Sequence, residues 1–216
     1  ELLAKVTPDY VCLGKRTLQD NGSWLSALKR DDVELVTDRI ARIEADGVVC
    51  ESGARYPVDV IVYATGFHAN RFLWPMEIIG RGGVSLREQW GDAPTAYLGI
   101  TVPNFPSFFC MYGPGTNLAH GGSLIFHSEC QIRYIMGCLR TLLERGLNTI
   151  ECTQAAHDDY DRRHQEALAK MVWSHPSIRS SWYRNDAGRI TVLSPWRLLD
   201  YWRWTQKPDL TDFHLV

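Results

Sequence analysis

The alternation of apolar and polar residues predicts a small antiparallel meander early in the chain. Residues 33–36 and 39–44 alternate as half-buried strands do. Asp46-Gly47 is a hairpin turn signal, so residues 47–51 are expected to return beside the preceding strand. Shorter elements are predicted before it, a strand at 10–14 and a helix at 24–29.

Two nearly continuous apolar runs, residues 58–64 and 107–112, are typical of interior strands of a parallel sheet. The stretch between them is rich in Gly, Pro and Trp, which favours ordered loop with short strands. Strand runs followed by helices indicate an α/β class, here part of a parallel sheet with an antiparallel meander attached.

A long helix is predicted after Ser123, which can cap it, and Gly146 ends it. Its expected apolar face consists of positions 125, 132, 135, 139, 142 and 143. A more polar helix is expected within 151–170. An aromatic-rich segment, a turn at 185–188, a strand and a helix at 195–205 complete the chain.

Composition narrows the possible partners of the chain. Its 216 residues carry a formal net charge of −2, so no basic face for nucleic acid is expected. No apolar stretch reaches the length of about 18 residues that a membrane span needs, and the first nine residues do not resemble a signal peptide. Six cysteines without a C-x-x-C pair favour a reduced, cytoplasmic protein with no metal site. The absence of an initiator Met suggests a fragment or a processed product.

The strongest local motif is Asp59-x4-Ala64-Thr65-Gly66-Phe67, in which a predicted strand ends in a corner of small residues. Gly66 can adopt backbone angles closed to other residues, and such a corner lets backbone amides meet a ligand. A purely structural turn explains the same pattern.

A second motif is Gly113-Pro114-Gly115-Thr116-Asn117-Leu118, which lies between a predicted strand and the long helix. Glycines allow a cofactor to approach closely, and the partial positive charge at a helix N-terminus favours an anionic group such as the edge of a reduced flavin. A Gly-Pro turn with a local cap at Asn117 is the alternative.

Two further features have both a functional and a structural interpretation. Lys15-Arg16, after a predicted strand and Gly14, can bind phosphate or stabilise developing negative charge, or can form surface ion pairs. The C-terminal tryptophans can line a cofactor cleft or simply pack. They are Trp173, Trp182, Trp196, Trp202 and Trp204.

Three other patterns are set aside. Residues 80–85 imitate a dinucleotide fingerprint, but Gly91 and Pro94 end any following helix after one or two turns. Residues 120–123 imitate an esterase oxyanion loop, but the nucleophile motif G-x-S-x-G is absent. His157 and His164 have no evident third metal ligand, so a solvated helix face is expected there.

Taken in order, these segments resemble the class B flavoprotein Baeyer–Villiger monooxygenases over nearly the whole chain. The segments that carry the resemblance are 14–16, 31–36, 59–67, 97–106, 113–118 and 181–185. The His120-Gly121-Gly122-Ser123 run and the Trp-rich tail look most like the 4-hydroxyacetophenone monooxygenase branch. The Asp-x4-Ala-Thr-Gly-Phe motif alone is shared with flavin enzymes that oxygenate N or S atoms.

The resemblance implies FAD and NADPH as cofactors and a ketone and O2 as substrates. In that family a C4a-peroxyflavin attacks the ketone, and the adduct rearranges to an ester or lactone. Arg16 matches the active-site arginine and Lys15 a residue near the NADP phosphates. Trp182 matches a mobile-loop tryptophan that reaches NADP. Residues 113–118 match the segment at the flavin ring.

The resemblance also implies that a portion is missing. Neither dinucleotide fingerprint nor the family signature between them is present, so this chain alone should hold FAD weakly or not at all, and should be inactive. The expected organisation is the end of the NADP domain and a linker (1–30), the C-terminal part of the FAD domain (31–150) and a helical, aromatic extension (151–216). The alternative is a non-catalytic domain that binds a nucleotide or a partner.

Overall fold

The computed structural model describes residues 1–118 and 121–216, and these form two compact units. Unit 1 consists of residues 1–10 and 17–67. Unit 2 consists of residues 11–16 and 68–216.

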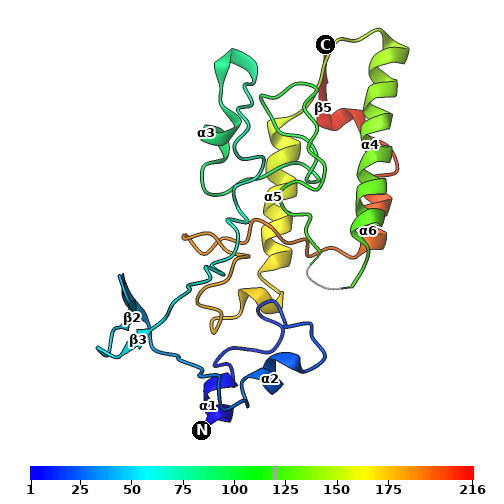
Figure 1. Cartoon of the computed structure of the whole chain (residues 1–216). Coiled ribbons are helices and arrows are strands. Elements are labelled where there is room, and N and C mark those ends of the chain that lie inside the picture. Colours follow the sequence, from blue (N-terminus) through cyan, green and yellow to red (C-terminus); the bar gives the residue numbers. More distant parts are fainter. Residues whose placement is uncertain (119–120) are drawn as a thin grey trace. The chain divides into compact units, whose positions relative to one another are not determined.

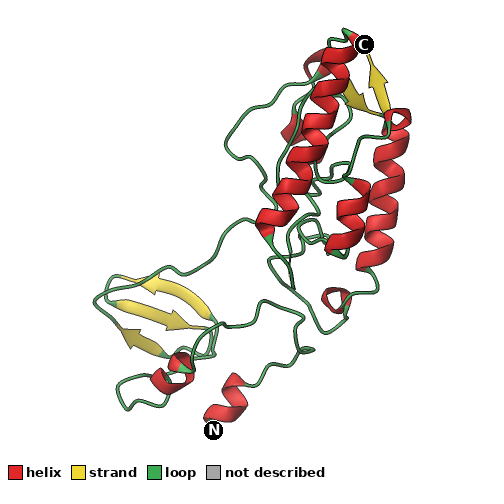
Figure 2. Ribbon diagram, turned by 90° about the vertical axis from the view of Figure 1, so that its right-hand side faces the viewer, coloured by secondary structure: helices red, strands yellow, loops and turns green. Residues whose placement is uncertain are grey.

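Unit 1 is built round the predicted meander. Its elements are α1 (Leu2–Val6), α2 (Ser23–Ala27), β1 (Ile40–Glu44), β2 (Gly47–Cys50) and β3 (Arg55–Pro57). The three strands form an antiparallel sheet in the order β1-β2-β3, which Figure 2 shows in yellow. Residues 45 and 46 make the predicted turn, but residues 33–36 form no strand.

The interior strand predicted at 58–64 is wrong for this chain. Residues 58–67 form neither helix nor strand and are exposed, with Val60 77% and Val62 81% exposed. An apolar strand is stable only beside hydrogen-bonded neighbours, and the described part of unit 1 supplies none after β3 ends.

Unit 2 contains the helices. Its elements are η1 (Arg81–Gly83), α3 (Leu86–Trp90), α4 (Leu124–Arg145), β4 (Ile150–Cys152), α5 (Gln154–Leu168), η2 (Val172–Ser174), α6 (Leu198–Trp204), η3 (Leu210–Asp212) and β5 (Phe213–Leu215). Figure 1 shows the two long helices α4 and α5, with α6 beside α4. β4 pairs with β5 in an antiparallel sheet. The α/β class is confirmed, with small antiparallel sheets and a long helix.

The helix ends follow the predicted caps. Ser123 Oγ accepts a hydrogen bond from the Phe126 amide, and Gly146, with φ of 63°, ends α4. α3 is only five residues long and stops before Gly91, as expected for a false fingerprint. α6 begins at Leu198 rather than at residue 195. The strand predicted at 107–112 is wrong, because these residues form turns and irregular backbone. The Cys110 amide donates to the Ile100 carbonyl.

The predicted core face of α4 is wrong in most positions. The structure buries His127, Cys130, Gln131, Tyr134, Cys138 and Leu142. Of the predicted positions, Ile125, Ile132, Leu139 and Leu143 are exposed. The buried polar residue Gln131 is tolerated because both ends of its amide are hydrogen-bonded.

No helix within residues 1–118 and 121–216 has the length and apolarity of a membrane span.

Candidate functional site

The segment 113–118 is held against the strand-like residues 191–194. The Gly115 amide donates to the Thr191 carbonyl over 2.8 Å, and the Asn117 amide donates to the Val192 carbonyl over 2.9 Å. The Ser194 amide in turn donates to the Asn117 carbonyl over 2.9 Å. Three main-chain bonds within a few residues give this segment one defined backbone path.

Gly115 is required by both its conformation and its surroundings. Its φ is +73°, and an added Cβ would lie 2.8 Å from His164 Nε2. That histidine, on α5, donates from Nε2 to the Leu193 carbonyl over 3.0 Å. Burial lowers the pKa of His164, so the ring is neutral at pH 7 and packs on the glycine as a flat, uncharged surface.

Gly99 supports the same segment from the other side. Its φ is +70°, and an added Cβ would collide with Thr116 Cγ2 and lie 3.0 Å from the Pro114 carbonyl oxygen. Thr116 is fully buried, and its hydroxyl donates to the Gly113 carbonyl over 2.6 Å. The main chain around Thr116 can therefore keep this position only because residue 99 is a glycine, which has no side chain.

Tyr112 orients the side chain of Asn117. The Tyr112 hydroxyl accepts a hydrogen bond from the Leu118 amide at 3.2 Å and donates to Asn117 Oδ1 at 2.6 Å. The Tyr112 amide is bonded to Gln131 Oε1 at 2.8 Å. Burial raises the pKa of Tyr112, which keeps the hydroxyl a donor. Because the Asn117 oxygen is engaged, its NH2 group is the end of the amide that can donate to a ligand.

The support extends through the core to α6. Gln131 Nε2 donates to the Tyr201 hydroxyl over 3.1 Å, and that hydroxyl donates to the Leu98 carbonyl over 2.7 Å. Both side chains in this series of bonds, Gln131 and Tyr201, are buried. The sequence did not indicate Tyr112, Gln131 or His164 as part of the site. Gln131 carried a signal, because it is a polar residue in a helix that is otherwise largely apolar.

His127 lies beside this network and is fully buried. Its ring stacks on that of Tyr201 with 3.9 Å between centroids, and neither ring nitrogen has a hydrogen-bond partner among the residues described. Burial lowers the pKa of His127 to about 4. The folded state therefore holds this ring neutral.

We expect His127 to make the fold sensitive to mild acid. In the unfolded chain its pKa returns to about 6.5, so the unfolded state binds more protons below that pH. Stability is full above pH 6.5 and is lost as the pH falls toward 4, by about 2 kcal/mol between pH 7 and pH 5. Urea unfolding at these two pH values, in the wild type and in His127→Phe, measures the difference. An equal acid sensitivity of the two proteins would contradict this role.

Arg16 lies in a turn that is docked on another part of unit 2. The Val11 amide donates to Ser177 Oγ over 3.0 Å, and Gly14 packs so closely on Ile178 that a side chain there would overlap it. Lys15 is half-buried and Arg16 is exposed. Among the residues that the structure describes, no carboxylate forms an ion pair with Arg16, so its guanidinium can meet a ligand.

Trp182 follows the segment on which this turn docks. It is 42% exposed, and its ring lies 5.0 Å from that of the buried Tyr183. The chain then turns at 185–188 and returns to Thr191. One continuous stretch, residues 177–194, therefore connects the Arg16 turn, Trp182 and the segment 113–118. Thr65 and Gly66 belong to unit 1, and Gly66 has the positive φ expected of a corner, +82°.

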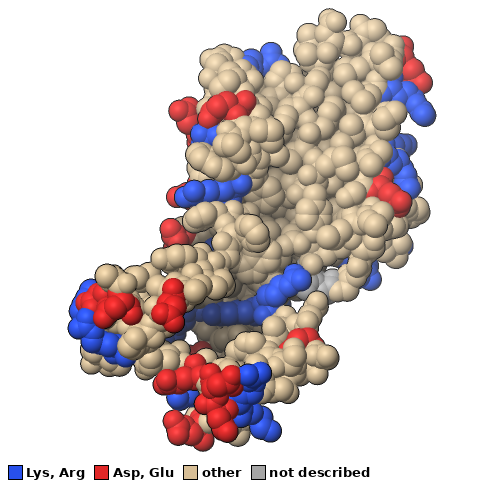
Figure 3. Space-filling view, in the orientation of Figure 1, with Lys and Arg blue, Asp and Glu red and all other residues tan. Residues whose placement is uncertain are grey.

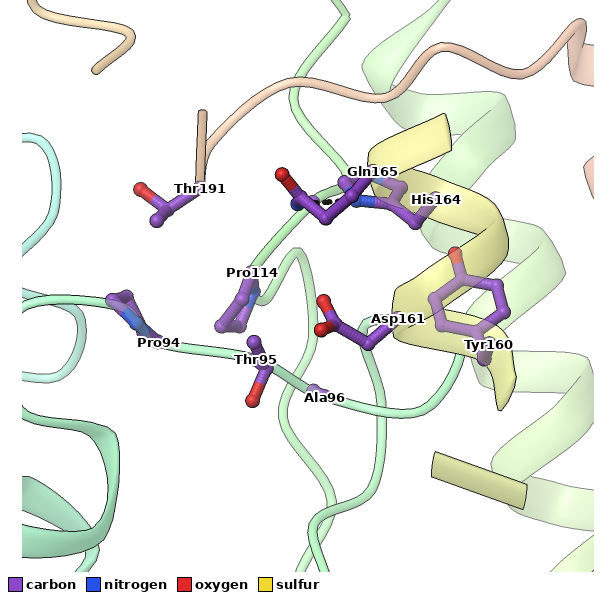
Figure 4. A pocket seen from close by; sticks show the side chains of 10 residues that line it. Pro94, Thr95, Ala96, Pro114, Tyr160, Asp161, His164, Gln165 and Thr191 are labelled. Atoms are coloured by element: carbon purple, nitrogen blue, oxygen red, sulfur yellow. Dashed lines mark hydrogen bonds between the residues drawn. The ribbon is translucent and has the colours of Figure 1, made fainter. Parts of the chain in front are cut away.

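A small polar pocket adjoins the segment 113–118 within unit 2. Figure 4 shows Pro114 and Thr95 at its centre, with His164 and Asp161 of α5 facing it. Asp161 is paired with Arg189, at 2.6 Å from Oδ2 to Nη2. This ion pair fixes the turn at 185–188 to α5.

The structure also bears on the solvated helix face expected at His157 and His164 and on the imitated oxyanion loop at 120–123. His164 does not lie on a solvated face, because it is 4% exposed and hydrogen-bonded to main chain. His157 Nε2 lies 3.0 Å from Thr95 Oγ1. His120 of the imitated oxyanion loop lies outside the described residues, and Ser123 serves as the cap of α4.

Comparisons with known proteins show which proteins the chain resembles. No protein-family profile matches the chain. The chain is 42% identical, over its whole length, to 32% of an uncharacterized monooxygenase of Sinorhizobium fredii. It is 32% identical, again over its whole length, to 41% of a Baeyer–Villiger monooxygenase of Pseudomonas aeruginosa.

Solved structures match the fold over the whole chain. A steroid monooxygenase bound to NADP superposes with a TM-score of 0.81 at 29% identity, and the chain covers 42% of it. A complex of OTEMO with FAD and NADP superposes with a TM-score of 0.83 at 23% identity. The chain thus spans about a third to two fifths of these proteins, and over its entire length it is similar to part of several monooxygenases, a Baeyer–Villiger monooxygenase among them.

Proposed function

We propose that the chain is the C-terminal portion of an FAD- and NADPH-dependent monooxygenase that inserts oxygen into ketones to give esters or lactones. The observation that carries the proposal is the match of this entire chain, at 29% identity, to part of a steroid monooxygenase bound to NADP. Because the chain spans only 42% of that protein, the activity belongs to the complete enzyme.

In this proposal, residues of unit 2 lie at the edge of the flavin ring, where NADPH also binds. FAD, when bound, supplies a ring that NADPH reduces and that then reacts with O2. The segment 113–118 offers a fixed backbone with a close approach at Gly115, and Asn117 offers an amide NH2 whose orientation Tyr112 sets. A donor that is already oriented costs no reorganisation when charge develops near it.

The other predicted residues take complementary roles in this proposal. Arg16 stabilises the negative charge that develops during oxygen transfer, and its planar guanidinium can hold two oxygens at once. Lys15 binds a phosphate of NADP, and Trp182 covers the bound nucleotide. Thr65 and Gly66 meet FAD at the corner where Gly66 has its positive φ.

The finer assignments belong to the same proposal. The 120–123 run and the tryptophans of the C-terminal segment favour the 4-hydroxyacetophenone branch and hence aryl ketones. The three-part organisation, 1–30, 31–150 and 151–216, refers to the complete enzyme, as does a cytoplasmic location, which the unpaired cysteines favour.

Product analysis tests the function. The complete enzyme, with FAD, NADPH and O2, is offered an aryl ketone, an alkyl sulfide and a tertiary amine. Ester formation supports the proposal, whereas sulfoxide or N-oxide without ester would indicate a monooxygenase that acts on S or N atoms. NADPH oxidation without any oxygenated product would indicate an oxidase that releases hydrogen peroxide, and no turnover at all would favour a non-catalytic role.

Trp182 is expected to serve the nucleotide rather than the core. Its ring is 42% exposed, so Trp182→Ala in the complete enzyme should raise the KM for NADPH and change the melting temperature little. Trp173, 5% exposed, is the matched control, and its replacement by Ala should cost about 3–5 kcal/mol of stability. Steady-state kinetics and thermal unfolding measure both. If Trp182→Ala lowers stability and leaves KM unchanged, the residue acts in packing.

A further inference from the structure

The longest helix of the chain has an apolar stripe on its solvent side. Ile125, Ile132, Met136 and Leu143 recur at spacings of seven, four and seven residues, and Leu139 lies beside them. Their exposed fractions are 73%, 47%, 56%, 84% and, for Leu139, 39%. At about 100° per residue, all five fall within about 40° of one line along α4. We call these five residues the α4 stripe.

The α4 stripe does not belong to the core of unit 2. Tyr134, which is 1% exposed, lies about 180° round the helix from Ile125, and Cys130 and Cys138 flank it on the buried side. A helix at the surface of a complete domain carries polar residues opposite its core. α4 instead has apolar residues on both sides, as does a helix that is enclosed between two layers.

The stripe has the form of an interface. It runs for about 27 Å along the helix, from Ile125 to Leu143. Glu129, Arg133, Arg140 and Glu144 lie along one flank of the stripe, and all four are exposed. An apolar centre with polar or charged residues at its rim is the usual anatomy of a protein contact surface. Figure 3 shows a face of unit 2 on which charged residues gather mainly at the margins.

Unit 1 independently presents apolar surface with no cover. Val60, Val62, Tyr63 and Phe67 are 77%, 81%, 71% and 95% exposed. Val60, Val62 and Tyr63 belong to the apolar run 58–64, which the sequence predicts as an interior strand, and Phe67 follows this run. An interior strand needs neighbours on both sides. The chain therefore exposes apolar side chains in two separate places, and large exposed apolar surfaces of soluble proteins mark interaction sites.

We propose that the α4 stripe packs, in the complete enzyme, against the portion of the same polypeptide that lies outside residues 1–216. The proposal rests on the function proposed above, in which the chain acts as part of a longer monooxygenase. The relatives provide the occupant, because 59% of the Pseudomonas aeruginosa enzyme lies outside the region that this chain covers, by subtraction of the 41% covered. The occupant presents an apolar ridge to the stripe and leaves the charged flank in water, since burying unpaired charges is costly.

Thiol labelling of the complete enzyme tests the surface. Met136→Cys places a thiol on the stripe, and Arg133→Cys places the matched control on the charged flank. Both are made in a Cys12→Ser background, because Cys12 is the exposed native cysteine of this chain and the other five are buried. Maleimide modification of each introduced thiol is followed by mass spectrometry of the α4 peptides in the folded and the urea-unfolded protein.

We expect the thiol at 136 to react at least tenfold more slowly than the thiol at 133 in the folded enzyme, and equally fast after unfolding. Leu143→Cys, near the other end of the stripe, should repeat the protection if Met136→Cys fails to fold. Equal rates at 136 and 133 in the folded enzyme would overturn the proposal. Protection that disappears on hundredfold dilution would also overturn it, because the occupant would then be a second copy.

The labelling result is independent of catalysis. If the stripe is protected in an enzyme that forms no ester, the proposed ketone oxidation is contradicted and the proposed packing of the α4 stripe is supported. If the stripe is unprotected in an enzyme that forms ester, the packing is contradicted and the ketone oxidation is supported.

Discussion

Replacement of Arg16 by alanine in the complete enzyme is expected to abolish ester formation from an aryl ketone while reduction of the flavin by NADPH persists. In the proposed function Arg16 stabilises charge that develops only during oxygen transfer, and loss of one such donor typically costs about 3–4 kcal/mol, or 100- to 1000-fold in rate. The reducing equivalents should then leave as hydrogen peroxide. Ester yield, peroxide yield and anaerobic flavin reduction are the three measurements.

Two further variants make this test specific. Arg16→Lys should restore little activity, because lysine lacks the planar fork that holds two oxygens. Arg162→Ala removes a surface arginine of α5 that pairs with Asp159 and Glu166, a contact worth less than about 1 kcal/mol, and should leave the products unchanged. Wild-type ester yield from Arg16→Ala would mean that Arg16 is only a surface cation.

Replacement of Gly99 by alanine is expected to destabilise unit 2 by about 3 kcal/mol. A side chain at φ of +70° is strained by about 1–2 kcal/mol, and the new Cβ collides with the buried Thr116, which adds about 1–3 kcal/mol of overpacking. The main chain at 114–116 must shift to relieve the collision. The purified complete enzyme should therefore also retain less FAD.

Gly82 is the matched control for this substitution. Its φ of +66° imposes a similar strain, but an added Cβ would meet nothing within 4 Å. Gly82→Ala should cost only about 1–2 kcal/mol and leave FAD content unchanged. Urea unfolding of both variants separates the collision from the strain. Equal destabilisation by the two substitutions would show that the packing of Gly99 on Thr116 is unimportant.

Local sequence patterns were sufficient to predict several elements of this protein. Alternation and the Asp46-Gly47 signal located the β1–β2 hairpin, and the caps Ser123 and Gly146 located α4, because both patterns act within a few residues. The ordered motifs also identified the relatives, since they combine many weak local signals along the chain. The roles of Arg16 and Trp182 remain predictions.

Contacts between residues far apart in sequence determine which side of each element is buried. Periodicity shows that α4 has an apolar stripe but not that the stripe faces away from the core of unit 2. The stripe lies outside because Gln131 and Tyr134 find hydrogen bonds or ring contacts within the core, and these contacts join residues far apart in sequence. The residues that hold the segment 113–118 in place are also set by contacts between distant parts of the sequence. Tyr112, His164 and Gly99 meet the segment 113–118 through such contacts, and no local pattern records them.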